Sequence, residues 1–279
     1  MNQLSRAERA QIIACLVEGN SIRATVRMTG KSKNTIAKLL LALGDACTDY
    51  MDKNLRNLKC KRLQCDEIWS FVYAKDKNVP AEKKGQFGFG DVWTWAAIDA
   101  ETKLIPAWYV GPRDLYSARC FVEDLASRLA SRVQLTSDGL KAYVEAVEGA
   151  FGSDIDFAQL IKIYGNQIGP KIPTEARYSP GVCTGAKKSP VTGEPNPSHI
   201  STSYIERQNL TMRMGIRRFT RLTNAFSKKL ENHIASVALH FMHYNFARVH
   251  QTLRVTPAME AGVSDHVWTT EEIAALVEG

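Results

Sequence analysis

Three acidic residues lie on separate predicted elements, as metal-dependent phosphodiester chemistry would need. Asp66 lies in a predicted strand, Asp138 ends a later strand, and Glu206 opens a predicted helix. Two divalent ions about 3.5–4 Å apart can activate a water or hydroxyl and stabilise the leaving oxygen, and carboxylates are their natural ligands. The acids must then converge at one sheet edge, where open α/β sheets commonly place functional groups.

The residues around two of these acids support this interpretation. Gly139 lets the chain leave the strand sharply beside Asp138. Arg213 and Arg217 follow Glu206 by seven and eleven residues, so a continuous helix would place all three on one face. An acid with guanidinium groups behind it suits a metal ligand whose helix also holds DNA phosphates.

Each acid also has an ordinary structural interpretation as a cap or turn former. Asp91 and Asp99 are comparable acids, which we interpret as a strand-entry residue and a turn residue. Glu67, beside Asp66, should point to the opposite face of its strand because side chains alternate. Local sequence context alone therefore does not decide which three of these acids form the site.

The elements that would position the acids follow from changes in period along the chain. After residue 62, segments rich in Ile, Trp, Phe, Val and Tyr predict strands, and apolar residues at steps of three to four predict helices. Three antiparallel-looking strands followed by alternating helix and strand indicate an α/β or α+β layer domain. We expect strands at 62–74, 91–100, 103–111, 133–138 and 157–165, and helices at 115–132, 139–151, 203–222 and 227–248.

Residues 4–43 have the layout of a helix-turn-helix DNA reader. Ser5 with Glu8 predicts a capping box, and Gly19 and Gly30 predict turns between short helices. A polar and basic helix N-terminus then follows, as in a recognition helix. A three-helix bundle that mediates protein contacts fits this segment equally well. On the first interpretation the residues facing DNA are Ser32, Lys33, Asn34 and Lys38.

Residues 165–201 interrupt the pattern of the core. They hold many Pro and Gly residues and little periodicity, which indicates a long loop or insertion. We therefore expect a helix-turn-helix domain and linker at 1–58, a catalytic domain at 59–252 containing this insertion, and a C-terminal tail with a short helix at 253–279.

Composition narrows the class of protein. A net charge of +7 favours a polyanionic partner, because Lys and Arg release counterions from phosphates. The six cysteines form no C-x-x-C pair, so we expect buried thiols in a reducing cytosol and neither a zinc site nor a disulfide framework. No segment predicts a signal peptide or a membrane span. We expect a cytoplasmic protein bound to the nucleoid.

A dense basic run follows the predicted Glu206 helix. A solvated helix face is its default interpretation, and phosphate contact is the better one in a DNA enzyme. The run consists of Arg217, Arg218, Arg221, Lys228 and Lys229.

Four of the six histidines share one helical arc near the C-terminus. We interpret His233, His240 and His243 as a polar stripe beside an apolar face, because no Cys or acid completes a tetrahedral metal set. His250 is a candidate accessory residue near the active site or DNA.

Several strings resemble the bacterial insertion-sequence-one transposase family, from residue 60 almost to the end. That family belongs to the DDE superfamily, which has an RNase H-like core. The block around Glu206 is very specific. The strings are CDEIWSFV, GDVWTWAAID, TSDGLKAY, STSYIERQNLTMRMGIRRFTRLTNAFSKK and HFMHYNFARVHQTLRVTPAMEAGV.

The resemblance implies that Asp66, Asp138 and Glu206 are catalytic acids that hold Mg²⁺, with Mn²⁺ as a substitute. It also places Arg213 in the basic position beyond the glutamate. Two departures stand out: no C-x-x-C segment precedes the helix-turn-helix, and the 68-residue gap from Asp138 to Glu206 (206 − 138 = 68) is longer than in many such enzymes.

We therefore expect a DNA transposase that cuts at the ends of an insertion sequence and joins the freed 3′-hydroxyls to target DNA. Two ends must be brought together, so a homo-oligomer on DNA is expected. Two other hypotheses are kept: a DNA-binding regulator that no longer cuts, and a structure-selective nuclease of the same fold.

Overall fold

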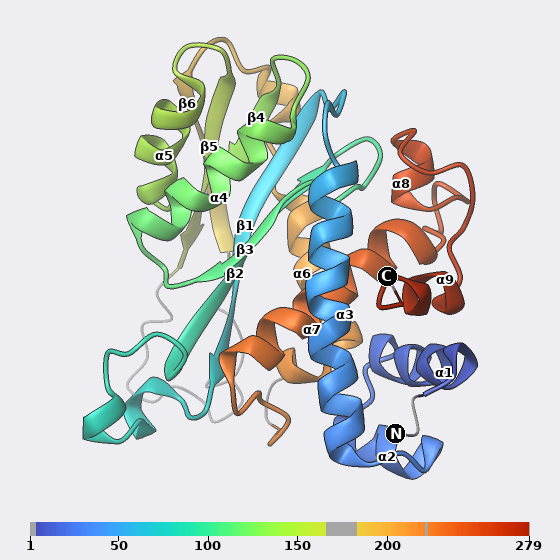
Figure 1. Cartoon of the computed structure of the whole chain (residues 1–279). Helices are drawn as coiled ribbons and strands as arrows, with labels where there is room; N and C mark the ends of the chain where they lie inside the picture. Colours follow the sequence, from blue (N-terminus) through green and yellow to red (C-terminus); the bar gives the residue numbers. More distant parts are fainter. Residues whose placement is uncertain (1–3, 166–182, 221–222, 279) are drawn as a thin grey trace.

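The computed structural model describes residues 4–165, 183–220 and 223–278, and a mixed sheet forms its centre (Figure 1). The sheet has six strands in the order β3-β2-β1-β4-β5-β6. The strands are β1 (Arg62–Val72), β2 (Gly90–Asp99), β3 (Trp108–Gly111), β4 (Gln134–Ser137), β5 (Asp156–Tyr164) and β6 (Cys183–Thr192).

The strand directions confirm the expected α/β fold with an RNase H-like mixed sheet. β1, β2 and β3 form an antiparallel meander. β4 pairs parallel to β1, and β5 pairs parallel to β4. Parallel neighbours need crossover connections, and helices supply them here. A central β4 parallel to β1 brings the carboxyl end of β4 beside the middle of β1.

Helices cover both faces of the sheet, which explains why its central strands are so apolar (Figure 1). α4 (Leu115–Arg128) and α5 (Ala142–Phe151) lie on one face. α6 (Ser203–Gly215), α7 (Leu230–Met242) and a π-helical turn (His243–Ala247) lie on the other. Trp95 is fully buried, and its ring meets that of Tyr143 edge-on at 5.4 Å between centroids.

The N-terminal segment forms three helices with the predicted caps. They are α1 (Arg6–Val17), α2 (Ile22–Thr29) and α3 (Lys33–Asn54). Ser5 and Glu8 form a capping box, and Gly30 ends α2 with a φ of 69°. That positive φ suits glycine, which lacks a Cβ.

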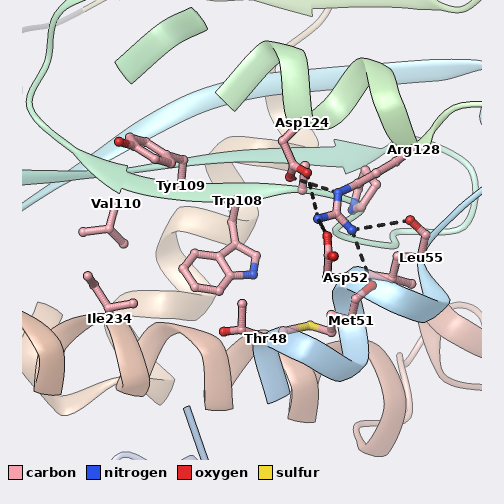
Figure 2. Close-up of a pocket in the computed structure, with 12 residues that line it drawn as sticks. Thr48, Met51, Asp52, Leu55, Trp108, Tyr109, Val110, Asp124, Arg128 and Ile234 are labelled. Atoms are coloured by element: carbon pink, nitrogen blue, oxygen red, sulfur yellow. Dashed lines mark hydrogen bonds and ion pairs between the residues drawn. The ribbon is translucent and has the colours of Figure 1, made fainter. Parts of the chain in front are cut away.

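α3 is much longer than predicted, because its C-terminal half belongs to the core of the molecule. Gly44 lies so close to α7 that a Cβ added there would be 2.4 Å from the Cβ of Ala235. At its C-terminus the carbonyls of Met51 and Leu55 accept from Arg128 of α4 at 3.4 Å (Figure 2). Cations favour this end of a helix dipole. α3 is therefore held against α7 near its middle and against α4 at its C-terminus.

The same arginine bounds a small apolar cavity between α3 and the edge strand β3. Arg128 donates to Asp52 and to Asp124, each at 2.9 Å, and Trp108 points into the space between them and α7 (Figure 2). The cavity measures about 300 Å³.

The C-terminal segment folds back on the first helix. It contains α8 (Pro257–Glu260) and α9 (Thr270–Ala275), and Thr269 caps α9 in a capping box with Glu272. Glu278 forms ion pairs with Arg6 and Arg9 of α1. One continuous set of buried apolar residues runs from α1 through the sheet to α9, and the three-part domain division remains a prediction.

Three predictions about elements are wrong, each for a physical reason. β6 lies inside the segment expected to be a loop; it is an edge strand with mostly exposed residues, so it shows no hydrophobic alternation. Of that segment, residues 166–182 lie outside the described residues. The helix from 203 ends at Gly215 instead of continuing to 222, because a 3-10 turn at Arg217–Phe219 follows. The helix expected from 227 begins only at Leu230, since Ser227 bridges to β1.

The remaining short turns connect the larger elements. 3-10 turns occur at Asp76–Asn78 and Ala81–Lys83 between β1 and β2, and at Pro197–His199 before α6. No helix in the described part of the chain combines the length and the apolar character that crossing a membrane requires.

Candidate active site

Asp66 and Asp138 meet where β4 ends beside β1. The parallel register pairs Cys65 with Ser137, so each acid is the next residue along its chain. Carboxylate oxygens of Asp66, Asp138 and Glu67 all lie within 4.8 Å of one another. The predicted convergence of the first two acids is therefore present in the structure.

Asp66 faces α6, and its side chain is half-buried at the wall of a cleft. Asn209 Nδ2 of α6 donates to its Oδ2 at 2.8 Å. Burial, together with the charges of Glu67 and Asp138, raises its pKa to about 8. An acid in this position binds a proton or a cation readily.

Glu67 points to the opposite face, as the alternation predicts, yet it belongs to the acid cluster. Its side chain is 1% exposed, Arg113 Nε donates to it at 2.6 Å, and the Tyr143 hydroxyl donates at 3.2 Å. Burial and the charge of Asp138 raise its pKa to about 7. Sequence reasoning missed Glu67 because strand alternation places it on the face of β1 opposite to Asp66. Asp138, however, lies beyond the end of β4, where side chains from both faces of β1 come close to it. Two adjacent acids in one strand were the available signal.

Glu206 lies in the first turn of α6 and lines the same cleft. Lys162 Nζ of β5 lies 2.5 Å from its Oε2, and the Thr202 hydroxyl donates to its other oxygen. Its charge contributes to the raised pKa of Asp66. The structure thus brings Glu206 to the cleft, although the tight cluster consists of Asp66, Glu67 and Asp138.

The cleft itself is open and holds both signs of charge. It encloses about 670 Å³ between β1, β5 and the start of α6. Arg113 Nη2 lies 3.6 Å from Asp138 Oδ2, and its guanidinium lies 4.9 Å from the centre of the Trp93 ring. Arg113 and Lys162 therefore give the acidic cleft two cationic walls.

The donor set fits a divalent cation. Asp66 and Asp138 offer carboxylate oxygens to the cleft, and burial together with repulsion from the neighbouring carboxylates disfavours the charged form of Asp66. A cation between them removes that repulsion, and hard oxygen ligands suit Mg²⁺ or Mn²⁺. Glu67 is already bonded to Arg113 and Tyr143, which makes it the less available ligand of the cluster.

The predicted DNA-facing residues of the N-terminal segment stand at the start of α3. Ser32 caps the helix by accepting from the Thr35 amide. Lys33, Asn34 and Lys38 are exposed. Their contact with DNA remains a prediction.

The basic residues after Glu206 are less uniform than predicted. Arg213 shares α6 with Glu206, but Arg217 lies beyond the end of that helix at Ile216, so the predicted common face is wrong for Arg217. Arg218 donates to Ser236 of α7 at 2.8 Å, and burial lowers its pKa to about 10. Arg221 lies outside the described residues.

Lys228 and Lys229 are both exposed. Lys228 Nζ lies 4.3 Å from the centre of the Phe226 ring, and Lys229 pairs with Glu231 at 3.4 Å.

The histidines of α7 are core residues, which corrects the predicted polar stripe. His233 and His240 are buried, and burial lowers the pKa of each to about 3. The helix packs against α3, and His233 shares a hydrogen bond with Ser70 of β1 at 3.2 Å; His243, in the π-helical turn, is half-buried. His250 shares a hydrogen bond with Thr252 at 3.1 Å. The described residues that line the acid cleft do not include His250.

Comparisons with known proteins give distant likenesses only. No family model matches the chain, and no curated protein matches it. Among solved structures, a piggyBac transposase synaptic complex with hairpin DNA is similar at 12% identity over 98% of this chain and 69% of that one, with a TM-score of 0.40. The Mos1 strand transfer complex is similar at 12% identity over 56% of this chain, with a TM-score of 0.25. The chain spans 59% of the length of the Mos1 chain.

Proposed function

We propose that the chain is a metal-dependent DNA transposase that cuts at element ends and joins them to target DNA. The observation that carries this proposal is the cleft that Asp66, Asp138 and Glu206 line from three separate parts of the chain. The sequence resemblance to insertion-sequence-one transposases supports the same three residues. The Mg²⁺ assignment follows from their oxygen chemistry.

Asp66 and Asp138 are the residues that would hold the cation, with Glu206 completing the set. A bound divalent cation supplies an activated water or 3′-hydroxyl and stabilises the leaving oxygen. Asn209 holds the Asp66 carboxylate in orientation through its 2.8 Å hydrogen bond. Such positioning by a neighbouring amide is typical of metal-binding carboxylates.

Arg113 and Lys162 would receive the phosphate. Both cations line the cleft and both are bonded to its acids, Arg113 to Glu67 and Lys162 to Glu206. A phosphate oxygen entering the cleft offers Lys162 an alternative partner, which would release Glu206 toward Asp66. Glu67 then acts as the residue that orients Arg113.

DNA ends would be held by the N-terminal helices and the basic residues after α6. Lys33, Asn34 and Lys38 lie exposed at the start of a well-capped helix, as a major-groove reader requires. We further propose a homo-oligomer on DNA, because two ends must be joined together, and a cytoplasmic, nucleoid-associated location.

A strand-transfer assay tests the proposal. Purified protein is incubated with Mg²⁺, labelled element ends and a plasmid target, and joined products are measured. We expect Asp66→Asn, Asp138→Asn and Glu206→Gln each to reduce joining below detection while affinity for the ends changes less than about threefold, since phosphate contacts elsewhere supply affinity. Asp91→Asn, an exposed acid at the entry of β2, is the matched control and should keep full activity.

The products separate the proposal from its two rivals. A nuclease gives cut DNA without joined DNA, and a regulator gives a mobility shift without cutting. Normal joining by the Asp66 or Asp138 variant would remove that residue from the site and refute the proposed mechanism.

A further inference from the structure

A second concave surface lies at the far end of β1, away from the acids. Three half-buried aromatic rings line it, Trp69 and Phe71 from β1 and Phe226 from the chain that precedes α7, together with the buried Phe219. The space between them measures about 460 Å³, within the range of small-ligand pockets. All three rings are half-buried, so each keeps an accessible surface.

The rings of Trp69, Phe71 and Phe226 form a row of tilted contacts along one side of this pocket. The centroids of Trp69 and Phe71 lie 5.7 Å apart, and those of Phe71 and Phe226 lie 4.8 Å apart. The interplanar angles are 38° and 35°. Rings in this arrangement offer π-faces on which a further planar group can stack.

The charged groups around the rings are cationic. Lys75 Nζ lies 5.9 Å from the centre of the Phe71 ring, and Lys228 Nζ lies 4.3 Å from that of Phe226. Thr223 and Asn224 add polar groups to the lining, and no acid belongs to the described residues that line it. A ligand with a flat ring and a negative charge complements this surface, and an apolar peptide does not use the cations.

The pocket continues the edge of β1 on which the acid cleft opens. On the side of β4 the ladder stops at Cys65, opposite Ser137. Among the described residues, the next backbone pairing on that edge of β1 is the bridge between Val72 and Ser227. The stretch between these points carries Asp66 at one end and the rings at the other, about 10–17 Å apart at about 3.3 Å per residue.

We propose that this aromatic pocket binds an unpaired nucleobase of the DNA strand that enters the acid cleft. The inference rests on the proposed action on DNA and adds a subsite to it. Base stacking on aromatic side chains tolerates any sequence, and the lysines would meet the flanking phosphates. The separation along β1 places the base about three to five stacked nucleotides from the cut, at about 3.4 Å per nucleotide.

Binding of two DNAs tests the pocket. One is a duplex with a single-stranded tail that carries 2-aminopurine at successive positions, and the other is the fully paired duplex of the same sequence. We expect the wild-type protein to quench 2-aminopurine at a position within about five nucleotides of the cut. Phe226→Leu, which keeps the apolar contact and removes the π-face, should abolish the quenching and weaken binding of the tailed DNA by about tenfold. Binding of the paired duplex should change less than about twofold.

Two further variants control for folding and for surface aromatic residues. Phe226→Tyr should restore quenching, and Tyr116→Ala, which removes an exposed ring on α4 outside the pocket, should behave as the wild-type protein. Equal quenching by the wild-type and Phe226→Leu proteins overturns the pocket and leaves the transposase proposal intact. Failure to bind either DNA overturns both.

Discussion

The carboxylates of Asp66, Glu67 and Asp138 lie within a few ångströms of one another at the end of β4, where burial and mutual repulsion oppose the charged forms of Asp66 and Glu67. Asp66 and Glu67 have raised pKa values for these two reasons. Arg113, just before α4, offsets part of the negative charge by pairing with Glu67. From the other elements around the cleft, Asn209 donates a hydrogen bond to Asp66 and Lys162 pairs with Glu206.

The raised pKa of Asp66 predicts how stability depends on pH without metal. Its folded pKa of about 8 exceeds its ordinary value of 3.8, so the protonated acid contributes stability that is fully present below about pH 4. That contribution is lost as the pH rises through about 8. In EDTA, the melting temperature should therefore fall as the pH rises from about 4 to about 8, most steeply between about pH 5 and 7, and level off above about pH 8.

Asp66→Asn should flatten this pH dependence, because the amide does not titrate. Mg²⁺ should raise the melting temperature of the wild-type protein most at high pH, since a ligand that binds the folded state stabilises it. Thermal unfolding followed by circular dichroism measures both effects. An equally steep pH dependence in Asp66→Asn would contradict the assignment of the shift to this residue.

At the scale of elements, α3 serves two parts of the molecule. Its first turns present Lys33 and Asn34 to solvent, while its second half packs against α7 and receives Arg128 at its C-terminus (Figure 2). The close approach of Gly44 to Ala235 sets the spacing of the two helices. α3 is therefore both a helix of the core and the helix whose start we propose to contact DNA.

Gly44→Ala should destabilise the protein by about 1–3 kcal/mol, because the new Cβ overpacks a closed helix contact. Its ideal position lies 2.4 Å from the Cβ of Ala235. Gly149→Ala is the matched control: this glycine lies in α5 with nothing within 4 Å of the added Cβ, so helix propensity should stabilise the protein by about 0.5–1 kcal/mol. Urea unfolding measures both, and equal effects of the two substitutions would exclude a close α3–α7 contact.

At the scale of the whole molecule, the two ends of the chain close on each other. α9 packs on α1, and Glu278 pairs with Arg6 and Arg9 (Figure 1). The surface ion pairs contribute little on their own. Ile273 of α9 is fully buried in the common core, so apolar packing is the main interaction that holds the C-terminal segment against α1.

Ile273→Ala should cost about 2–5 kcal/mol, the range for truncating a buried aliphatic side chain. Val267→Ala, six residues earlier and 41% exposed, should cost less than about 0.5 kcal/mol. The free energy of unfolding in urea distinguishes them. A small effect of Ile273→Ala would show that the C-terminal segment unfolds separately from the core.

Much of the architecture could be predicted because it depends on interactions between residues that are close in the sequence. The caps at Ser5 and Ser32, the turn at Gly30 and the apolar strand around Asp66 each follow from short-range chemistry. β6 could not be predicted, since an exposed edge strand has no alternation to detect. The end of α6 at Gly215 was also missed, because a helix-compatible sequence continues into a 3-10 turn that packs Phe219.

The sequence by itself determined which acids are present, the strands and the helix that carry them and the class of fold. Only the tertiary structure decided that Glu67 joins Asp66 and Asp138, that Arg113 and Lys162 enter the cleft, and that the α7 histidines are buried. The reason is that strand alternation and helical period describe one element at a time. Which side chains share a space depends on where β4 ends beside β1 and on how closely the helices pack around that point.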